Sequence, residues 1–127
     1  MNNFISQRHA LTGLRIMIAI IMMAHGFQRL YYGTVGNFGD FLNDKGFLIG
    51  KTIAWGITLF ELTAGAILAI GFFQRWITLT WMIVIIFGIF LVHLQYGWYV
   101  VGPGSGGVEY SCLILVCLVV LASDKRK

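Results

Sequence analysis

The fold of this chain is decided by the stretch Thr52–Phe73, TIAWGITLFELTAGAILAIGFF. A helix needs around 20 apolar residues to cross the hydrocarbon core of a bilayer, and this stretch carries a single charged side chain, Glu61. A charge at membrane depth is costly unless it is paired or takes part in chemistry. Glu61 shares its helical face with small residues, which predicts that it points toward other helices and not toward lipid. These residues are Ala54, Thr58, Gly65 and Ala69.

The rest of the chain has a similar composition. Its 127 residues are 58% hydrophobic and only 11% charged, whereas a soluble domain carries about 25% charged residues. The basic residues that give the net charge of +4 are dispersed between apolar runs, which argues against a nucleic-acid partner. We therefore expect a single integral membrane domain, residues 1–127, surrounded by the lipid bilayer.

Four apolar segments predict an all-α fold, an integral membrane four-helix bundle. The helices are expected at about 11–27, 52–73, 76–95 and 108–122. A tight turn is expected at Gln74-Arg75. In the first outward loop, Asn37–Asp44 is predicted to form a short interfacial helix with Phe38, Phe41 and Leu42 on one face. The Gly102–Gly107 segment predicts a turn-rich second outward loop.

The distribution of basic residues predicts the orientation of the bundle. Arg29, Lys45 and Lys51 fall on one side of the predicted membrane. Six basic residues fall on the other side, which the positive-inside rule assigns to the cytoplasm together with both termini. These six are Arg8, Arg15, Arg75, Lys125, Arg126 and Lys127.

Four ionisable residues, one in or beside each apolar segment, are candidates for chemistry. His25, His93 and Glu109 are predicted at the same level near the outer ends of three helices, and Glu61 lies deeper. Polar clusters of this kind mark ligand or proton paths in membrane proteins, and histidine titrates near neutral pH. We assign all four as candidate catalytic or proton-exchanging residues.

The neighbours of these residues leave two interpretations open. Glu61 is either a functional proton acceptor or a structural partner of Arg15 that fixes two helices together. Arg29 follows His25 by one helical turn and is expected to pair with Glu61 or Glu109. With Gln28, His25 and His93, it is also a candidate for binding a cofactor.

The sequence disfavours metal and haem sites. His25 and His93 could ligate haem axially, but both lie near the rim, where a porphyrin would lack apolar depth. The two histidines with Glu61 and Glu109 could ligate a metal, but the Glu-x-x-His pairs of metal-binding bundles are missing. We predict no metal site.

Several short motifs, in order along the chain, resemble the DoxX family of small bacterial membrane proteins. His25–Leu30, HGFQRL, is similar to the family motif H-G-x-Q-K/R-L, and Glu61 with Gly65 resembles its E-x-x-x-G. Gly71–Arg75 resembles the G-x-x-T-R link, although Gln74 replaces the usual Thr. His93 and the Gly106–Tyr110 stretch resemble the histidine of the third helix and the G-G-x-E-Y opening of the fourth. The similarity covers about residues 12–122.

The resemblance implies a four-helix protein of the bacterial inner membrane, whose chain crosses the membrane several times. The family includes the membrane subunit of a thiosulfate:quinone oxidoreductase, so quinone is the cofactor that it suggests. We expect a membrane component of a redox system that binds quinone or a similar lipid-soluble molecule near the outer face. The chain has no redox motif of its own, so any enzymatic activity would be that of a quinone-linked oxidoreductase subunit that receives electrons from a protein partner. The alternatives are a non-catalytic scaffold or anchor of a larger complex or homo-oligomer, and a small transporter or lipid-handling protein.

Overall fold

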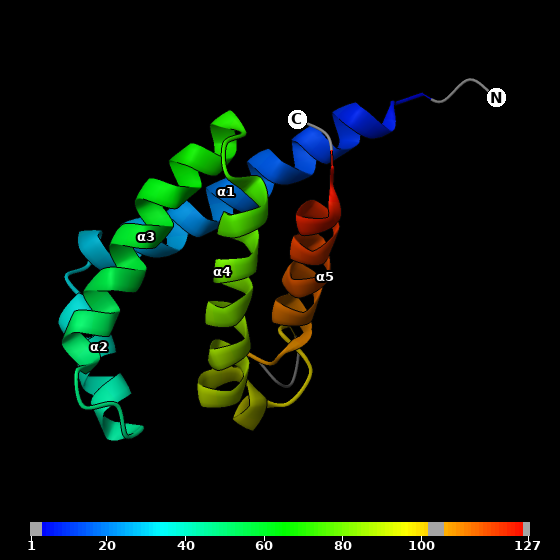
Figure 1. Ribbon diagram of the computed structural model, residues 1–127. Helices are drawn as coiled ribbons and strands as arrows, with labels where there is room; N and C mark the ends of the chain where they lie inside the picture. The colour runs from blue at the N-terminus through cyan, green and yellow to red at the C-terminus, as the bar shows by residue number, and fades with distance from the viewer. Residues whose placement is uncertain (1–3, 102–105, 126–127) are drawn as a thin grey trace. The chain divides into compact units, whose positions relative to one another are not determined.

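The computed structural model describes residues 4–101 and 106–125, and all of their regular structure is helical (Figure 1). This confirms the predicted all-α class. Two predicted features lie outside the described residues, namely the segment 102–105 of the second loop and the basic pair Arg126 and Lys127. The helices are α1 (Gln7–Tyr31), α2 (Val35–Asp44), α3 (Gly50–Ile70), α4 (Gln74–Gly88) and α5 (Glu109–Ser123), and α4 continues into a π-helical turn (Ile89–His93) and a 3-10 turn (Leu94–Tyr96).

The first helix is longer than its apolar core. It was expected at about 11–27 but begins at Gln7, because the Ser6 hydroxyl accepts a hydrogen bond from the His9 backbone N–H and caps the helix. Polar side chains cap helix starts because the first amides have no partner within the helix. At the other end the helix continues through Arg29 to Tyr31. The helix predicted from the apolar run is therefore too short at both ends.

The turn between α3 and α4 lies earlier than expected. The helix α3 ends at Ile70 because Gly71 adopts a left-handed conformation, with φ of 107°, which glycine tolerates at this position without strain. Phe73 also has a positive φ, 55°, and Gln74 and Arg75 already belong to α4. The turn predicted at Gln74-Arg75 is thus misplaced toward the C-terminus, since the glycine sets the break.

The helices form two compact units, one with α1, α2 and α3 and one with α4 and α5. In the first unit, α3 packs against both α1 and α2. Its buried residues recur every three or four positions along one face, which is the spacing that aligns side chains on a helix. They are Gly50, Ala54, Thr58, Glu61, Ala64, Gly65 and Leu68.

Two glycines allow α1 and α3 to approach closely. A Cβ atom on Gly26 of α1 would lie 2.9 Å from the Thr58 backbone oxygen, and one on Gly65 of α3 would lie 2.5 Å from Met23 Cγ. Small residues at contact points are how membrane helices pack in the absence of a hydrophobic driving force between them. The close crossing places the Glu61 turn of α3 directly against Gly26.

The segment predicted as an interfacial helix is helical and forms α2, extended by two residues to Val35. It is joined to α3 by the Asn43 side chain, whose Oδ1 accepts a hydrogen bond of 2.8 Å from the Gly50 backbone N–H. A Cβ atom on Gly39 would lie 2.7 Å from Lys51 Cα. The helix α2 therefore packs tightly on the first turn of α3.

In the second unit, α4 and α5 contact each other along their lengths. Gln74 at the start of α4 donates a hydrogen bond of 2.8 Å to the Leu121 carbonyl near the end of α5, so the two helices run antiparallel. Trp81 of α4 and Leu118 of α5 are fully buried. The loop that follows the 3-10 turn pairs with the start of α5, since the backbone N–H of Glu109 donates to the Trp98 carbonyl and that of Val108 to the Gly97 carbonyl.

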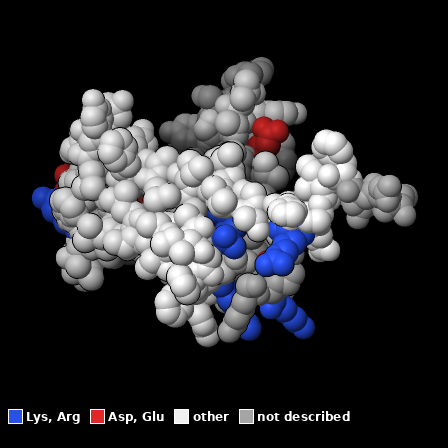
Figure 2. All heavy atoms as spheres, turned by 90° about the horizontal axis from the view of Figure 1, so that it is seen from above, with Lys and Arg blue, Asp and Glu red and all other residues white. Residues whose placement is uncertain are grey.

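Three helices of the described chain are long and apolar enough to cross a membrane. They are α1, α3 and the continuous helix Gln74–Tyr96, and α5 is apolar but shorter. Most of the surface in Figure 2 belongs to residues that are neither acidic nor basic. We conclude that this is a membrane protein. The four-helix bundle, the single domain and the cytoplasmic location of both termini remain predictions.

Candidate functional site

Glu61 lies at the centre of the most buried polar group in the first unit. Its side chain is 2% exposed and forms an ion pair with Arg29, with 2.5 Å between Oε1 and the guanidinium Nη1. The expectation that Arg29 pairs with Glu61 or Glu109 thus resolves to Glu61. The pair joins the end of α1 to the middle of α3, and it neutralises a carboxylate that would otherwise be a charge in an apolar environment.

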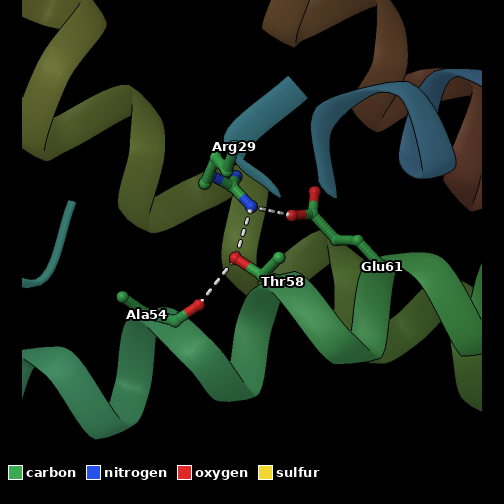
Figure 3. A network of polar contacts seen from close by, with 4 residues as sticks. All are labelled: Arg29, Ala54, Thr58 and Glu61. Carbon is green, nitrogen blue, oxygen red and sulfur yellow. Dashed lines mark hydrogen bonds and ion pairs between the residues drawn. The ribbon is translucent and has the colours of Figure 1, made fainter. Parts of the chain in front are cut away.

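Thr58 extends the ion pair into a chain of hydrogen bonds (Figure 3). Arg29 Nη1 also donates to the Thr58 hydroxyl at 3.2 Å, and this hydroxyl donates to the Ala54 carbonyl at 2.8 Å. The Thr58 oxygen therefore accepts from the cation and donates its own proton to the helix backbone. Both Nη1 protons are used in this way, so the guanidinium is held in one orientation.

The third element of the site is α2. The Phe38 ring lies against the guanidinium, with 4.8 Å between Arg29 Cζ and the ring centroid. An aromatic face attracts a cation at this distance. The Arg29 side chain remains 17% exposed, and neither Nε nor Nη2 donates to a residue in the described part of the chain. These nitrogens are not buried, since Arg15 Nε is the only buried nitrogen without a partner among the described residues.

Arg15 interacts with the C-terminal end of α3. Its Nη2 donates to the Ala69 carbonyl at 3.4 Å, about 12 Å along the helix from Glu61 at the usual rise per residue. The Ala69 carbonyl belongs to the last turn of α3, where carbonyl groups lack helical partners and cations are favoured. The structure thus gives Arg15 a helix-capping contact, and Glu61 its ion pair with Arg29.

The predicted ligand-binding residues His25 and Gln28 differ from Arg29 in exposure. Both are exposed on α1, whereas the Arg29 side chain is 17% exposed. The physical reason is helical geometry. The face of α1 that packs on α3 includes Met22 and Gly26, and His25 is rotated from Gly26 by about 100° around the axis.

His93 and Glu109 belong to the second unit and both contact the loop between α4 and α5. His93 lies in the π-helical turn, and its Nδ1 is 2.7 Å from the Gly106 carbonyl oxygen. Glu109 is exposed and accepts a hydrogen bond of 3.2 Å from the Val100 backbone N–H. Of the four residues of the predicted common site, His25 and Glu61 thus belong to the first unit and His93 and Glu109 to the second. That the four form one site stays a prediction.

The contact of His93 fixes which nitrogen carries the proton in the neutral ring. A carbonyl oxygen can only accept, so Nδ1 must be the donor to Gly106. The neutral form then has an unprotonated Nε2, which is available as a hydrogen-bond or proton acceptor. Within either unit, the described residues provide no group of three His, Cys, Asp or Glu side chains placed to hold a metal ion.

Sequence reasoning missed two residues of the Arg29 site. Thr58 was assigned only to the small-residue face, and Phe38 only to an interfacial helix. The spacing of Thr58 and Glu61, three residues apart on one face, was a usable signal for a shared partner. The contact between Phe38 and Arg29 joins two helices across a turn and has no such local signal.

The motifs at this site agree with a comparison to known families. The model of the DoxX family matches residues 10–94, well over half of the chain. This chain belongs to the DoxX family. The match covers α1, α2, α3 and the helix up to Leu94, and so it includes both partners of the Arg29–Glu61 pair. No curated protein and no solved structure matches the chain.

In this DoxX-family protein, the short sequence motifs of the matched region can be assigned to contacts in the structure. The HGFQRL motif contributes Gly26 to the helix crossing and Arg29 to the ion pair, and E-x-x-x-G contributes Glu61 and Gly65. The Gly106–Tyr110 stretch lies beyond the matched residues. Four residues of these motifs, Gly26, Arg29, Glu61 and Gly65, therefore take part in one helix contact and its ion pair.

Proposed function

We propose that this DoxX-family protein is a membrane component of a redox system that binds a quinone, or a similar lipid-soluble carbonyl compound, beside Arg29. The observation that supports this most directly is the arrangement of the guanidinium. One of its nitrogens is occupied by Glu61 and Thr58, and the remaining donors are accessible. A quinone needs hydrogen-bond donors to its carbonyl oxygens and an aromatic or apolar surface for its ring.

Each part of the site has a role in this proposal. Arg29 donates to one quinone carbonyl, and Phe38 supplies an aromatic surface next to the ring. Glu61 holds the guanidinium in place and keeps the site neutral overall before the ligand is reduced. Reduction of a quinone to a quinol takes two electrons and two protons, and the electrons come from a redox protein partner. His25, His93 and Glu109 would supply protons from the aqueous side.

The proposed topology places this site near the outer face of the bacterial inner membrane, in a chain that crosses it several times. Arg29 lies near the end of α1 that the positive-inside rule assigns to the outside. A lipid-soluble ligand would reach it from the bilayer. Gln28 and His25, both exposed on the same helix, would contact the ligand as it enters.

Quinone binding to the purified protein tests the proposal. A short-chain quinone is titrated into the full-length protein in a nonionic detergent, and quenching of tryptophan fluorescence reports binding. We expect Arg29→Lys and Phe38→Ala to weaken binding at least tenfold. The matched control is Phe41→Ala, because Phe41 lies on the same helix under Lys45, with 5.5 Å between Nζ and the ring centroid. Unchanged affinity in Arg29→Lys and Phe38→Ala would refute the proposal.

A second candidate function, a non-catalytic scaffold or anchor, is favoured by a different observation. Glu61, His93, Glu109 and Arg15 each hydrogen-bond another part of their own unit. In a scaffold, these contacts only fix helices and loops, and the wild-type protein should bind no quinone. Substitutions of these four residues would then reduce stability or the amount of co-purifying protein partners, and no ligand would be lost.

A further inference from the structure

Arg15 is a further charged residue of α1, and its guanidinium has few hydrogen-bond partners in the described part of the chain. Its one hydrogen bond to a described residue is the 3.4 Å contact with the Ala69 carbonyl. Its Nε is buried and has no partner among the described residues. Nη1 also forms no hydrogen bond to a described residue and, unlike Nε, is not fully buried.

The depth of this guanidinium follows from α3. The 21 residues of this helix rise about 31 Å, which matches a hydrocarbon core of about 30 Å. The end of α3 therefore lies at the level of the lipid headgroups, in the proposed topology. Arg15 lies at that end, since a Cβ atom on Gly71 would be 3.3 Å from both Cζ and Nη1. The exposed rings of Phe72 and Phe73 follow, as is common at an interface.

The charge at this end of α3 is only partly balanced. The C-terminus of a helix carries about half a negative charge, whereas the guanidinium carries a full positive one. Glu61 is occupied by Arg29, and the other acidic residues of the first unit, Asp40 and Asp44, lie on α2. No acidic side chain of this unit therefore balances Arg15, and the anion that is abundant at headgroup level is phosphate.

We propose that Arg15 binds the phosphate group of an anionic phospholipid at the C-terminal end of α3. The planar fork of arginine can donate two parallel hydrogen bonds to phosphate oxygens, which lysine cannot. Gly71 leaves room for the guanidinium, because any side chain there would meet it. The bound lipid would then contact α1 and α3 together and hold their inner ends in register.

Native mass spectrometry of the full-length protein tests this site. Phosphatidylglycerol and phosphatidylcholine with identical acyl chains are added to protein in a nonionic detergent without phosphate groups. We expect the wild type to retain phosphatidylglycerol several-fold over phosphatidylcholine, and Arg15→Gln to lose that preference. Lys45→Gln removes the same charge from the end of α2 and should keep it.

Two further measurements keep the test decisive. Arg15→Lys keeps the positive charge that favours the end of α3, so the fold is retained, and it should weaken the preference several-fold because the fork is lost. Full preference in Arg15→Lys or in Arg15→Gln would overturn the proposal, as would a wild type without any preference. Displacement of phosphatidylglycerol by an equal concentration of inorganic phosphate would assign the site to a soluble anion and overturn the lipid assignment.

Discussion

At the residue scale, the ion pair of Glu61 and Arg29 determines how substitutions in the first unit behave. Glu61 is the only acidic side chain that is buried among the described residues. Two nitrogen–oxygen contacts, to Glu61 and to Thr58, hold Arg29 on α3. Removal of one charge leaves the other without a partner in an apolar environment, which is more costly than removal of both.

Glu61→Gln should lower the free energy of unfolding by about 2 kcal/mol, less than for a fully buried pair because Arg29 is partly exposed. The double variant Glu61→Gln with Arg29→Gln should be more stable than the sum of the single effects predicts, with a coupling of about 1 kcal/mol or more between residues in contact. Reversible unfolding in mixed detergent, followed by tryptophan fluorescence, measures these values. Strict additivity of the two substitutions would show that the pair contributes no coupling energy.

At the scale of the elements, the crossing of α1 and α3 depends on Gly26. A side chain there would meet the backbone oxygen of Thr58 at 2.9 Å, and the backbone cannot move aside as the end of a flexible side chain can. The same contact brings Arg29, one turn later on α1, to Glu61. Helix packing and the polar site are therefore coupled through one glycine.

Gly26→Ala should destabilise the protein by about 1–3 kcal/mol, the usual range for overpacking a well-packed contact. Gly56→Ala is the matched control, because Gly56 also lies in a helix but a Cβ atom there would meet no other atom within 4 Å. That control should be neutral or stabilising by up to about 1 kcal/mol, since alanine favours the helix. The same unfolding measurement compares the two. Equal effects would mean that the close crossing does not contribute to stability.

The face of α3 around Glu61 was predictable, because helical periodicity alone places small residues beside it. Whether Arg15 or Arg29 would pair with Glu61 was not, since spacing along a chain does not fix the offset between two helices. His25 is exposed because its neighbour Gly26, and not the histidine, occupies the packed face. The contact between Phe38 and Arg29 could not be predicted either, because it depends on how the turn between α1 and α2 orients the two helices.

For the whole molecule, the basic residues and the apolar spans predict the orientation in the membrane. Arg8 and Arg15 precede or begin the apolar part of α1, and Lys125 follows α5. Lys45 and Lys51 lie near the ends of α2 and α3 that face each other across a short loop. This asymmetry predicts that both termini are cytoplasmic and that the loop between α2 and α3 is external.

Reporter fusions test the orientation directly. A reporter active only in the cytoplasm should be active after the last residue, Lys127, and inactive when inserted at Gly46. A periplasmic reporter should give the reverse pattern at the same positions. An active cytoplasmic reporter at Gly46 would show that the topology is the reverse of the predicted one and that the Arg29 site lies near the inner face.

The hydrogen bond between Asn43 and Gly50 has a consequence for motion. Because the Asn43 side chain satisfies the first amide of α3, the detachment of α2 must leave that amide without its partner. The helix α2 and the first turn of α3 should therefore open together, as one cooperative unit with one opening free energy. Since α2 carries Phe38, this opening would also separate the aromatic ring from the Arg29 guanidinium. The lifetime of the aromatic wall of the Arg29 site would then depend on a hydrogen bond made by Asn43, outside the site itself.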